Sequence, residues 1–284
     1  MHPRDSAIPK IIPDLQRAVR TALEEDIGSG DITAQLVPAD RSARARVTTR
    51  EDCILSGRAW VEEVFQQLDA ELKLHWYFAD GDRITANTVV LELEGNARAM
   101  LTGERTALNF LQTLSGTATT AAEFAAQAAG TEVKILDTRK TIPGLRSAQK
   151  YAVLCGGCYN HRIGLYDAFL IKENHIAAAG GIDTAVARAR ALNPEALVEI
   201  EVESIEELQQ ALKSGADVIM LDEFNDSETR TALSLAKGRA KIEISGSVDR
   251  DRIEQLGALE VDYISSGSLT KHLRAIDLSL RIDL

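Results

Sequence analysis

From about residue 133 onward the sequence repeats one pattern, and this repeat constrains the fold more than any other feature. Each unit begins with a short apolar, β-branched run, ends that run on a polar residue and continues with helical periodicity. Six such runs occur, at 133–136, 168–171, 197–202, 218–221, 242–244 and 263–264. Their ends lie about 20 to 35 residues apart, which leaves room for one crossover helix each. Repeated βα units predict a parallel sheet.

Polar or charged residues stand at the carboxyl end of every run. They are Asp137 to Lys140, Lys172, Glu201, Asp222, Ser245-Gly246 and Ser265-Ser266-Gly267. An open doubly wound sheet gathers its functional residues at one switch point, whereas a barrel brings all strand ends to one mouth. We therefore predict an α/β fold whose C-terminal part is an open parallel β/α barrel.

The first part of the chain has a different pattern. We expect helices at 13–25 and 59–68, and strands at 43–49, 71–78 and 84–93. This mixture predicts a separate N-terminal α+β sandwich domain.

An amphipathic helix at 98–114 joins the two parts. Its buried stripe is Ala107, Leu108, Leu111 and Leu114, while Arg105 lies on the polar face and is expected to be solvated. We place the N-terminal domain at 1–114 and the barrel at 115–269, with a C-terminal tail, 270–284, that could pack on the N-terminal domain.

The stretch from Asp137 to His175 is basic within an acidic chain. It carries six Lys or Arg against three Asp or Glu, although the whole chain has a net charge of -11. Concentrated cations indicate a small, highly charged anionic ligand. A pI near 5.0 argues against a nucleic-acid partner. The absence of a long apolar run and of an apolar signal core leads us to expect a cytoplasmic protein without a membrane span.

The three cysteines, Cys53, Cys155 and Cys158, cannot form a disulfide framework, which fits a reducing compartment. Cys155 and Cys158 have a redox or half-zinc spacing. No second cysteine pair accompanies them, so we favour a small-residue turn with two packing thiols.

The predicted barrel mouth combines three kinds of group. Cations would come from Arg139, Lys140, Arg162 and Lys172, and carboxylates from Glu201 and Asp222. The backbone N–H groups of Ser245-Gly246-Ser247 and Ser266-Gly267-Ser268 could cradle a phosphate. Together these groups suit a phosphorylated sugar that carries pyrophosphate, with magnesium or sugar hydroxyls on the carboxylates and a carboxylate-bearing co-substrate on the arginines.

Each group also has a purely structural interpretation. Glu199, Glu201 and Glu203 alternate along one strand and could form satisfied ion pairs inside a barrel. Asp222 could simply terminate a strand, and a Ser-Gly loop is more often a turn. The conjunction of all groups on one rim favours a binding site.

Several motifs resemble the quinolinate phosphoribosyltransferase family from about residue 13 to the C-terminus. They are DTRKTIPGLR at 137–146, NHR at 160–162, IKENH at 171–175, EEDIG at 24–28, GDIT at 30–33 and LTGERTALN at 101–109. The resemblance implies a magnesium-dependent glycosyltransferase of NAD biosynthesis, a pentosyltransferase. It would convert quinolinate and phosphoribosyl pyrophosphate into nicotinate mononucleotide, pyrophosphate and carbon dioxide.

The resemblance also implies roles for individual residues. Arg139, His161 and Arg162 would hold the quinolinate carboxylates, with Arg105 supplied by the partner subunit of a homodimer, which could assemble further. Lys140 and Lys172 would contact the anionic substrates. Glu201 and Asp222 would bind ribose hydroxyls and the metal, and the two Ser/Gly loops the 5-phosphate. Thr138 is expected to bind substrate, and Lys140, Glu201 and Asp222 are the expected catalytic residues.

Three residues depart from the family pattern: Cys158 in the glycine run, Glu223 where Asn is common, and Ser247 where Asn is common.

Two other functions remain open. One is a paralogous phosphoribosyltransferase-like protein of the molybdenum-transport type, against which the intact Arg139, His161 and Arg162 set speaks. The other is a non-catalytic barrel that binds phosphorylated metabolites, which would need neither Glu201 nor Asp222.

Overall fold

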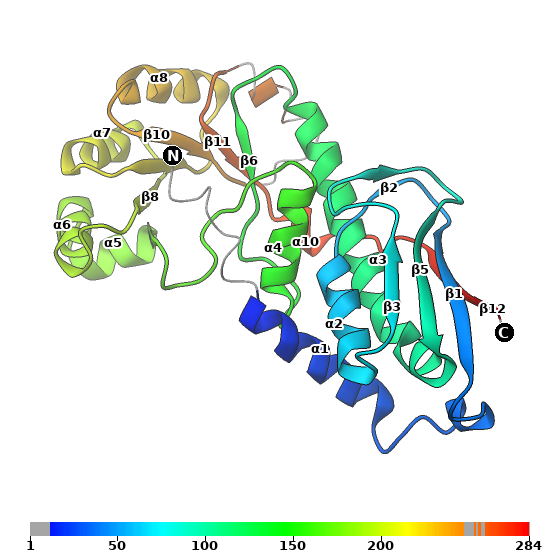
Figure 1. Cartoon of the computed structure of the whole chain (residues 1–284). Coiled ribbons are helices and arrows are strands. Elements are labelled where there is room, and N and C mark those ends of the chain that lie inside the picture. Colours follow the sequence, from blue (N-terminus) through cyan, green and yellow to red (C-terminus); the bar gives the residue numbers. More distant parts are fainter. Residues whose placement is uncertain (1–11, 247–252, 254, 257–258, 284) are drawn as a thin grey trace. The chain divides into compact units, whose positions relative to one another are not determined.

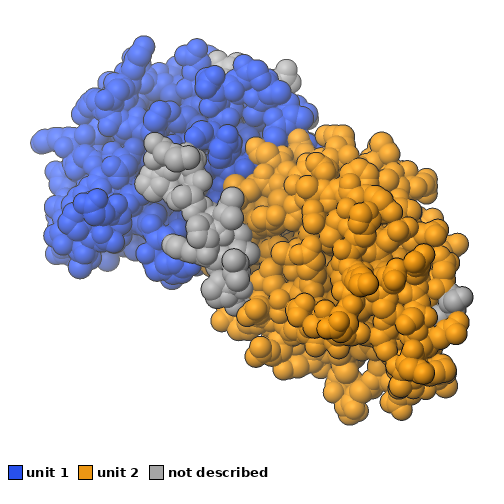
Figure 2. All heavy atoms as spheres, viewed as in Figure 1, with its two compact units in different colours: residues 1–6, 123–140, 158–268 blue, residues 7–122, 141–157, 269–284 orange. Residues whose placement is uncertain are grey.

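The computed structural model describes residues 12–246, 253, 255–256 and 259–283, which fall into two compact units. Among the described residues, unit 1 contains residues from 123–140 and 158–268, and unit 2 contains residues from 12–122, 141–157 and 269–283 (Figure 2). The domain boundaries drawn from the sequence stay a prediction. The compact units divide the chain differently, because residues 141–157 belong to unit 2.

Unit 1 is built on a six-stranded parallel sheet in the order β6-β11-β10-β9-β8-β7. The strands are β6 (Lys134–Leu136), β7 (Phe169–Ile171), β8 (Val198–Val202), β9 (Val218–Leu221), β10 (Lys241–Ile244) and β11 (Tyr263–Ser265). Each coincides with a predicted run to within one residue. The consecutive strands β6 and β7 lie at opposite edges of the sheet, as in the predicted open barrel.

Alternation along the strands determines which side chains face inward. Val198, Ile200 and Val202 of β8 pack in one apolar cluster with residues of the surrounding helices. These helices are α5 (Glu173–Ala179), α6 (Ile182–Leu192), α7 (Ile205–Ser214) and α8 (Asp226–Ala236), seen around the strands in Figure 1. Because successive side chains point to opposite faces, Glu199 and Glu201 face the interior of the barrel.

The ends of α7 match the signals in the sequence. The Ser204 hydroxyl accepts a hydrogen bond from the backbone N–H of Glu207 at 3.2 Å, and Gly215 closes the helix with φ of 81°.

Unit 2 contains a four-stranded antiparallel sheet in the order β12-β1-β5-β3. The strands are β1 (Ser42–Thr49), β3 (Lys73–Trp76), β5 (Val89–Asn96) and β12 (Leu278–Asp283). One apolar core unites this sheet with α1 (Ile12–Ile27), α2 (Arg58–Leu68), α3 (Ala97–Gln127) and α4 (Arg146–Cys155). Shorter elements are η3 (Ala34–Leu36) and α10 (Ser268–Lys271).

Two elements of unit 2 differ from the prediction. The expected strand at 84–93 is divided into β4 (Arg83–Ile84), which pairs with β2 (Cys53–Ile54), and β5. Asn87 between them has φ of 61°, a left-handed conformation that interrupts a strand. The helix expected to end at 114 continues to Gln127.

Beyond residue 114, α3 passes very close to the backbone of Arg274, and a small residue stands at this point. A Cβ built on Gly116 would lie 2.2 Å from the carbonyl oxygen of Arg274, so only glycine fits there.

No helix among the described residues combines the length and the apolar character required to cross a bilayer.

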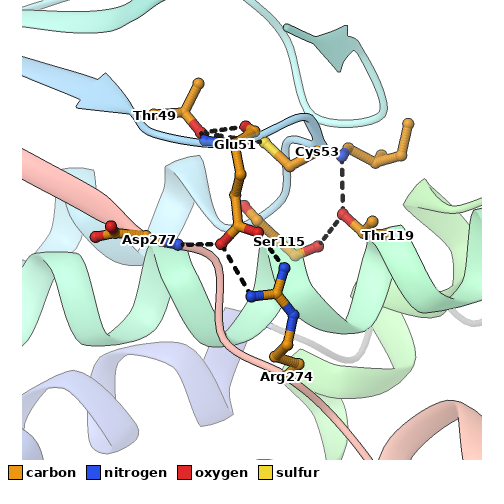
Figure 3. A network of polar contacts seen from close by, with 8 residues as sticks. Thr49, Glu51, Cys53, Ser115, Thr119, Arg274 and Asp277 are labelled. Carbon is orange, nitrogen blue, oxygen red and sulfur yellow. Dashed lines mark hydrogen bonds and ion pairs between the residues drawn. The ribbon is translucent and has the colours of Figure 1, made fainter. Parts of the chain in front are cut away.

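Glu51 fastens the segment that precedes β12, as Figure 3 shows. Its Oε1 accepts the backbone N–H of Asp277 at 2.7 Å, and its carboxylate forms an ion pair with Arg274. The Thr49 hydroxyl donates to the carbonyl of Glu51 at 2.7 Å. The turn after β1 thus binds the C-terminal segment, which then pairs with β1 as β12.

Candidate active site

Lys172 and Glu201 meet at the carboxyl ends of two neighbouring strands. Ile171 of β7 is opposite Ile200 of β8, so the residues that follow them face each other. Lys172 Nζ lies 2.5 Å from Glu201 Oε2. The Glu201 side chain is 10% exposed and that of Lys172 42%, so the lysine shields the carboxylate at the rim.

Asp222 follows β9 directly, and β9 is the neighbour of the strand that carries Glu201. Glu201 is opposite Met220, so Asp222 stands two residues farther along on the same face. Its half-buried side chain has no hydrogen bond or ion pair with any described residue. Glu223 comes next with φ of 60°, which turns the chain sharply after the aspartate. Glu201 and Asp222 therefore offer carboxylate oxygens at one place on the barrel rim.

The segment after β6 lies against the loop after β11. Thr138 Oγ1 accepts the backbone N–H of Lys140 at 3.0 Å. A Cβ built on Gly267 would lie 2.8 Å from Lys140 Cδ and 3.5 Å from Thr138 Oγ1. Glycine at 267 therefore lets the lysine side chain cross the Ser-Gly loop, so a cation and backbone N–H groups lie together.

Arg139 is half-buried in the same segment. Its Nε is buried and has no hydrogen-bond acceptor among the described residues. A buried donor without an acceptor costs roughly 1–3 kcal/mol, and more when it is charged. An anionic ligand would satisfy this donor.

The loop after β11 is tightly folded. The Ser266 hydroxyl accepts the backbone N–H of Ser268 at 3.3 Å, and the Ser266 backbone N–H donates to the carbonyl of Leu136 at 3.0 Å. Ser245 and Gly246 follow β10, and Gly246 has φ of 130°. Ser247, the last predicted member of that loop, lies outside the described residues.

His161 enters the barrel from a segment that runs beside β6. Tyr159 bridges Leu136 in parallel, and its backbone N–H donates to the carbonyl of Ile135 at 2.8 Å. The buried Asp137 carboxylate accepts the Asn160 side-chain amide at 2.7 Å and the His161 backbone N–H at 2.9 Å. These contacts direct the His161 side chain inward.

The imidazole of His161 is buried between glutamates of two strands. Its Nε2 lies 3.0 Å from Glu199 Oε2 and 3.4 Å from Glu243 Oε1, and both glutamates are fully buried. Because β8 and β10 are separated by β9, their side chains converge in this way only if the sheet curves strongly, as in a barrel.

These three residues have the donor types of a metal site. The contact made by Nδ1 of His161 argues against a metal ion at this place. Nδ1 accepts the backbone N–H of Arg162 at 2.7 Å, so the neutral ring carries its hydrogen on Nε2, the nitrogen that a metal would need.

Sequence reasoning missed the organising roles of Asp137, Asn160 and Glu243. The alternation in Lys241–Ile244, with a glutamate between isoleucines, was the available signal for Glu243. Arg105 is exposed on α3 in unit 2.

Comparison with known proteins agrees with this geometry. A solved nicotinate-nucleotide pyrophosphorylase from Francisella tularensis is 49% identical, with a TM-score of 0.92 and coverage of 95% of this chain and 96% of that one. A probable nicotinate-nucleotide pyrophosphorylase (carboxylating) of Bacillus subtilis is 41% identical over 92% of this chain and 90% of its own. A quinolinate phosphoribosyltransferase (decarboxylating) of Nicotiana tabacum is 39% identical over 95% of this chain and 82% of its own.

Two family models together match almost the whole chain. The N-terminal domain of quinolinate phosphoribosyl transferase matches residues 31–115, and its C-terminal domain matches residues 117–281. The parallel strands, the basic segment after β6 and the acidic rim all lie within the second match. The chain therefore belongs to the quinolinate phosphoribosyl transferase family.

Proposed function

We propose that this protein transfers the phosphoribosyl group of phosphoribosyl pyrophosphate to quinolinate and decarboxylates the product. The products are nicotinate mononucleotide, pyrophosphate and carbon dioxide, in NAD biosynthesis. The observation that carries the proposal is the buried Nε of Arg139, which lacks an acceptor among the described residues and stands beside Lys140. Family membership and the carboxylates on the same rim support it.

The carboxylates are suited to the sugar. When the bond between the ribose anomeric carbon and pyrophosphate breaks, positive charge develops on the ribose, and Glu201 or Asp222 can stabilise it. The quinolinate nitrogen then bonds to the anomeric carbon. Lys140 and Lys172 would bind the anionic substrates, and the loops at Ser245-Gly246 and Ser266-Gly267-Ser268 the 5-phosphate.

Decarboxylation follows from the first step. The ribosylated ring nitrogen is cationic, so the adjacent carboxylate leaves as carbon dioxide and the ring stabilises the resulting carbanion. This carbon takes up a proton from water. Arg139 and Arg162 need only hold and orient the ring through its carboxylates, with Thr138 as a further contact.

Glu201 and Asp222 fit a magnesium ion, which prefers carboxylate oxygen ligands. The Asp222 carboxylate fits particularly well, because no contact with a described residue would have to be broken. Bound magnesium would offset the charge of the departing pyrophosphate.

We also propose that the protein acts as a homodimer in which Arg105 completes the partner's site. Arg105 is exposed on α3, where it could reach another chain. The same unit exposes Ile32 and Leu36 by 82% and 84%, apolar surface that an interface would cover.

The test is a direct assay of the purified protein with phosphoribosyl pyrophosphate and magnesium. We expect release of labelled carbon dioxide from quinolinate labelled at the carboxyl group beside the nitrogen. Arg139→Met, which keeps the length but removes the charge, should lose this activity. Turnover of nicotinate without turnover of quinolinate would exclude the proposed reaction, and tight phosphate-ester binding without turnover would favour a sensor.

A further inference from the structure

Gln149 is a fully buried glutamine on α4 whose side-chain amide is hydrogen-bonded at both ends. Its Oε1 accepts the backbone N–H of Ile142 at 2.8 Å. Its Nε2 donates to the carbonyl of Thr270 at 2.9 Å and lies 3.5 Å from Thr117 Oγ1 on α3. These partners fix the orientation of the amide, because a flipped amide would oppose donor to donor and acceptor to acceptor.

The first partner of Gln149 lies just beyond the basic pair. Ile142 follows Lys140 by two residues, in the segment that leads into α4. The same segment is held a second time where Arg146 Nε donates to Thr141 Oγ1 at 3.2 Å. The chain that leaves Lys140 is therefore fastened to α4.

The second partner lies just beyond the Ser-Gly loop after β11. Ser268 is the last residue of this loop and the first of α10, and Thr270 follows it by two residues. Thr270 is fully buried, and its carbonyl accepts the Gln149 amide. Ile142, Gln149 and Thr270 all belong to unit 2. One amide thus joins the two segments that follow the basic pair and the loop.

The same two segments approach each other again within unit 1. There the Lys140 side chain crosses Gly267, as described above. Two residues of chain span at most about 7 Å. Because Ile142 and Thr270 are tied to one amide, Lys140 and Ser268 cannot move far apart.

We propose that Gln149 is a positioning residue that sets the spacing between Lys140 and the loop at 266–268. Through this spacing it determines the affinity for the phosphate groups of phosphoribosyl pyrophosphate. Gln149 is buried and acts only through its two backbone contacts. The inference rests on the proposed function for the identity of the substrate.

The residues proposed to hold quinolinate are fixed by other contacts. The Asp137 carboxylate accepts the backbone N–H of His161 at 2.9 Å, and Asp167 accepts that of Ile163 at 2.7 Å. Neither contact involves Gln149. A change at Gln149 should therefore weaken the binding of phosphoribosyl pyrophosphate more than that of quinolinate.

Two substitutions separate the hydrogen bonds of Gln149 from its volume. Gln149→Met keeps the length of the side chain and removes both backbone contacts. Gln149→Glu keeps an acceptor for the Ile142 N–H, but its second oxygen can donate to the Thr270 carbonyl only when it is protonated. Gln66→Glu, on the exposed face of α2, is the matched control.

We expect Gln149→Met to raise KM for phosphoribosyl pyrophosphate about tenfold, and KM for quinolinate by no more than about twofold. Gln149→Glu should lie between wild type and Gln149→Met, and Gln66→Glu should match wild type. A Gln149→Met enzyme with normal KM values would show that the side chain only fills space. Equal rises for both substrates would show a general loss of structure. Either result would overturn the proposal.

Calorimetric titration with phosphoribosyl pyrophosphate alone separates this inference from the proposed reaction. It measures Kd without turnover, so the same order of affinities should appear even in a protein that does not convert quinolinate. Lack of turnover would then refute only the proposed function. Equal Kd values for wild type and Gln149→Met would refute the role of Gln149.

A measurement on the wild-type protein covers the case in which the variants fail to fold. In NMR exchange experiments, the Gln149 side-chain amide and the Ile142 backbone N–H should exchange slowly with solvent. Phosphoribosyl pyrophosphate should slow both further, because a ligand on Lys140 and the loop holds the two segments together. Exchange that this substrate leaves unchanged would contradict the proposal.

Discussion

Lys172 and Glu201 face each other across β7 and β8, with Nζ 2.5 Å from Oε2. The pair keeps the Glu201 carboxylate at the rim, on the same face as Asp222. An ion pair on the rim of a barrel contributes little to stability, because its lysine is partly solvated. The Lys172–Glu201 pair therefore matters for the chemistry at the rim more than for the stability of the fold.

Glu201→Gln should lower kcat by about 100- to 1000-fold, since the amide keeps the shape but removes the charge that faces the developing ribosyl cation. Steady-state kinetics with both substrates would measure this. The exposed Glu206→Gln on α7 is the matched control and should behave as wild type. A Glu201→Gln enzyme with normal kcat would remove Glu201 from the mechanism.

Mixed dimers test the shared site. Arg105→Ala and Arg139→Ala chains should each be inactive alone, but a heterodimer of the two contains one site with both arginines. Random pairing of equal amounts should restore about a quarter of the wild-type activity. Heterodimers isolated by two different tags should show about half of the wild-type activity, because one of their two sites is intact. Inactive heterodimers would mean that each site uses its own Arg105.

The thiols should be unreactive in the folded protein. Burial raises the pKa of all three, that of Cys158 to about 12. Only the thiolate reacts, so labelling by a disulfide reagent at pH 8 should be far slower in the native than in the unfolded protein. The fold favours the neutral Cys158 thiol, so this contribution to stability should be lost as pH rises above 9. Rapid labelling, or a disulfide between Cys155 and Cys158 after mild oxidation, would revive a redox role.

Glu51 should make the C-terminal segment sensitive to acid. The Asp277 N–H and Arg274 lower the pKa of Glu51 from 4.5, so its stabilising effect is present above that pH and disappears as pH falls through the lowered value. Calorimetry should show a higher Tm for wild type than for Glu51→Gln at about pH 6, and a smaller difference at about pH 3. Glu71→Gln, an exposed control, should show no such trend. A difference that does not change with pH would contradict the assignment.

Local patterns in the sequence predicted much of this fold. Apolar runs located the six parallel strands, and Ser204 and Gly215 located the ends of α7, because such signals depend on neighbouring residues. The strand expected at 84–93 was wrong because a left-handed Asn87 divides it. The end expected for α3 at 114 was wrong because no residue after it breaks the helix.

The surroundings of His161 depend on residues far apart in the sequence. Glu199 and Glu243 alternate with apolar residues along their strands, which marks them as inward-facing, but only the curvature of the sheet brings both to one ring. The role of Arg139 was expected from the family motif. The structure adds the buried Nε that no described residue satisfies.

The pairing of β12 with β1 has a consequence for how the chain folds during synthesis. Residues 42–49 leave the ribosome early, yet their partner strand is made from residues 278–283. The antiparallel sheet cannot be completed, and one edge of β1 stays unpaired, until every strand of the barrel has been synthesised. An unpaired edge is a template for association with other chains. Nascent chains of this protein should therefore need protection at β1 until residues 278–283 have been synthesised.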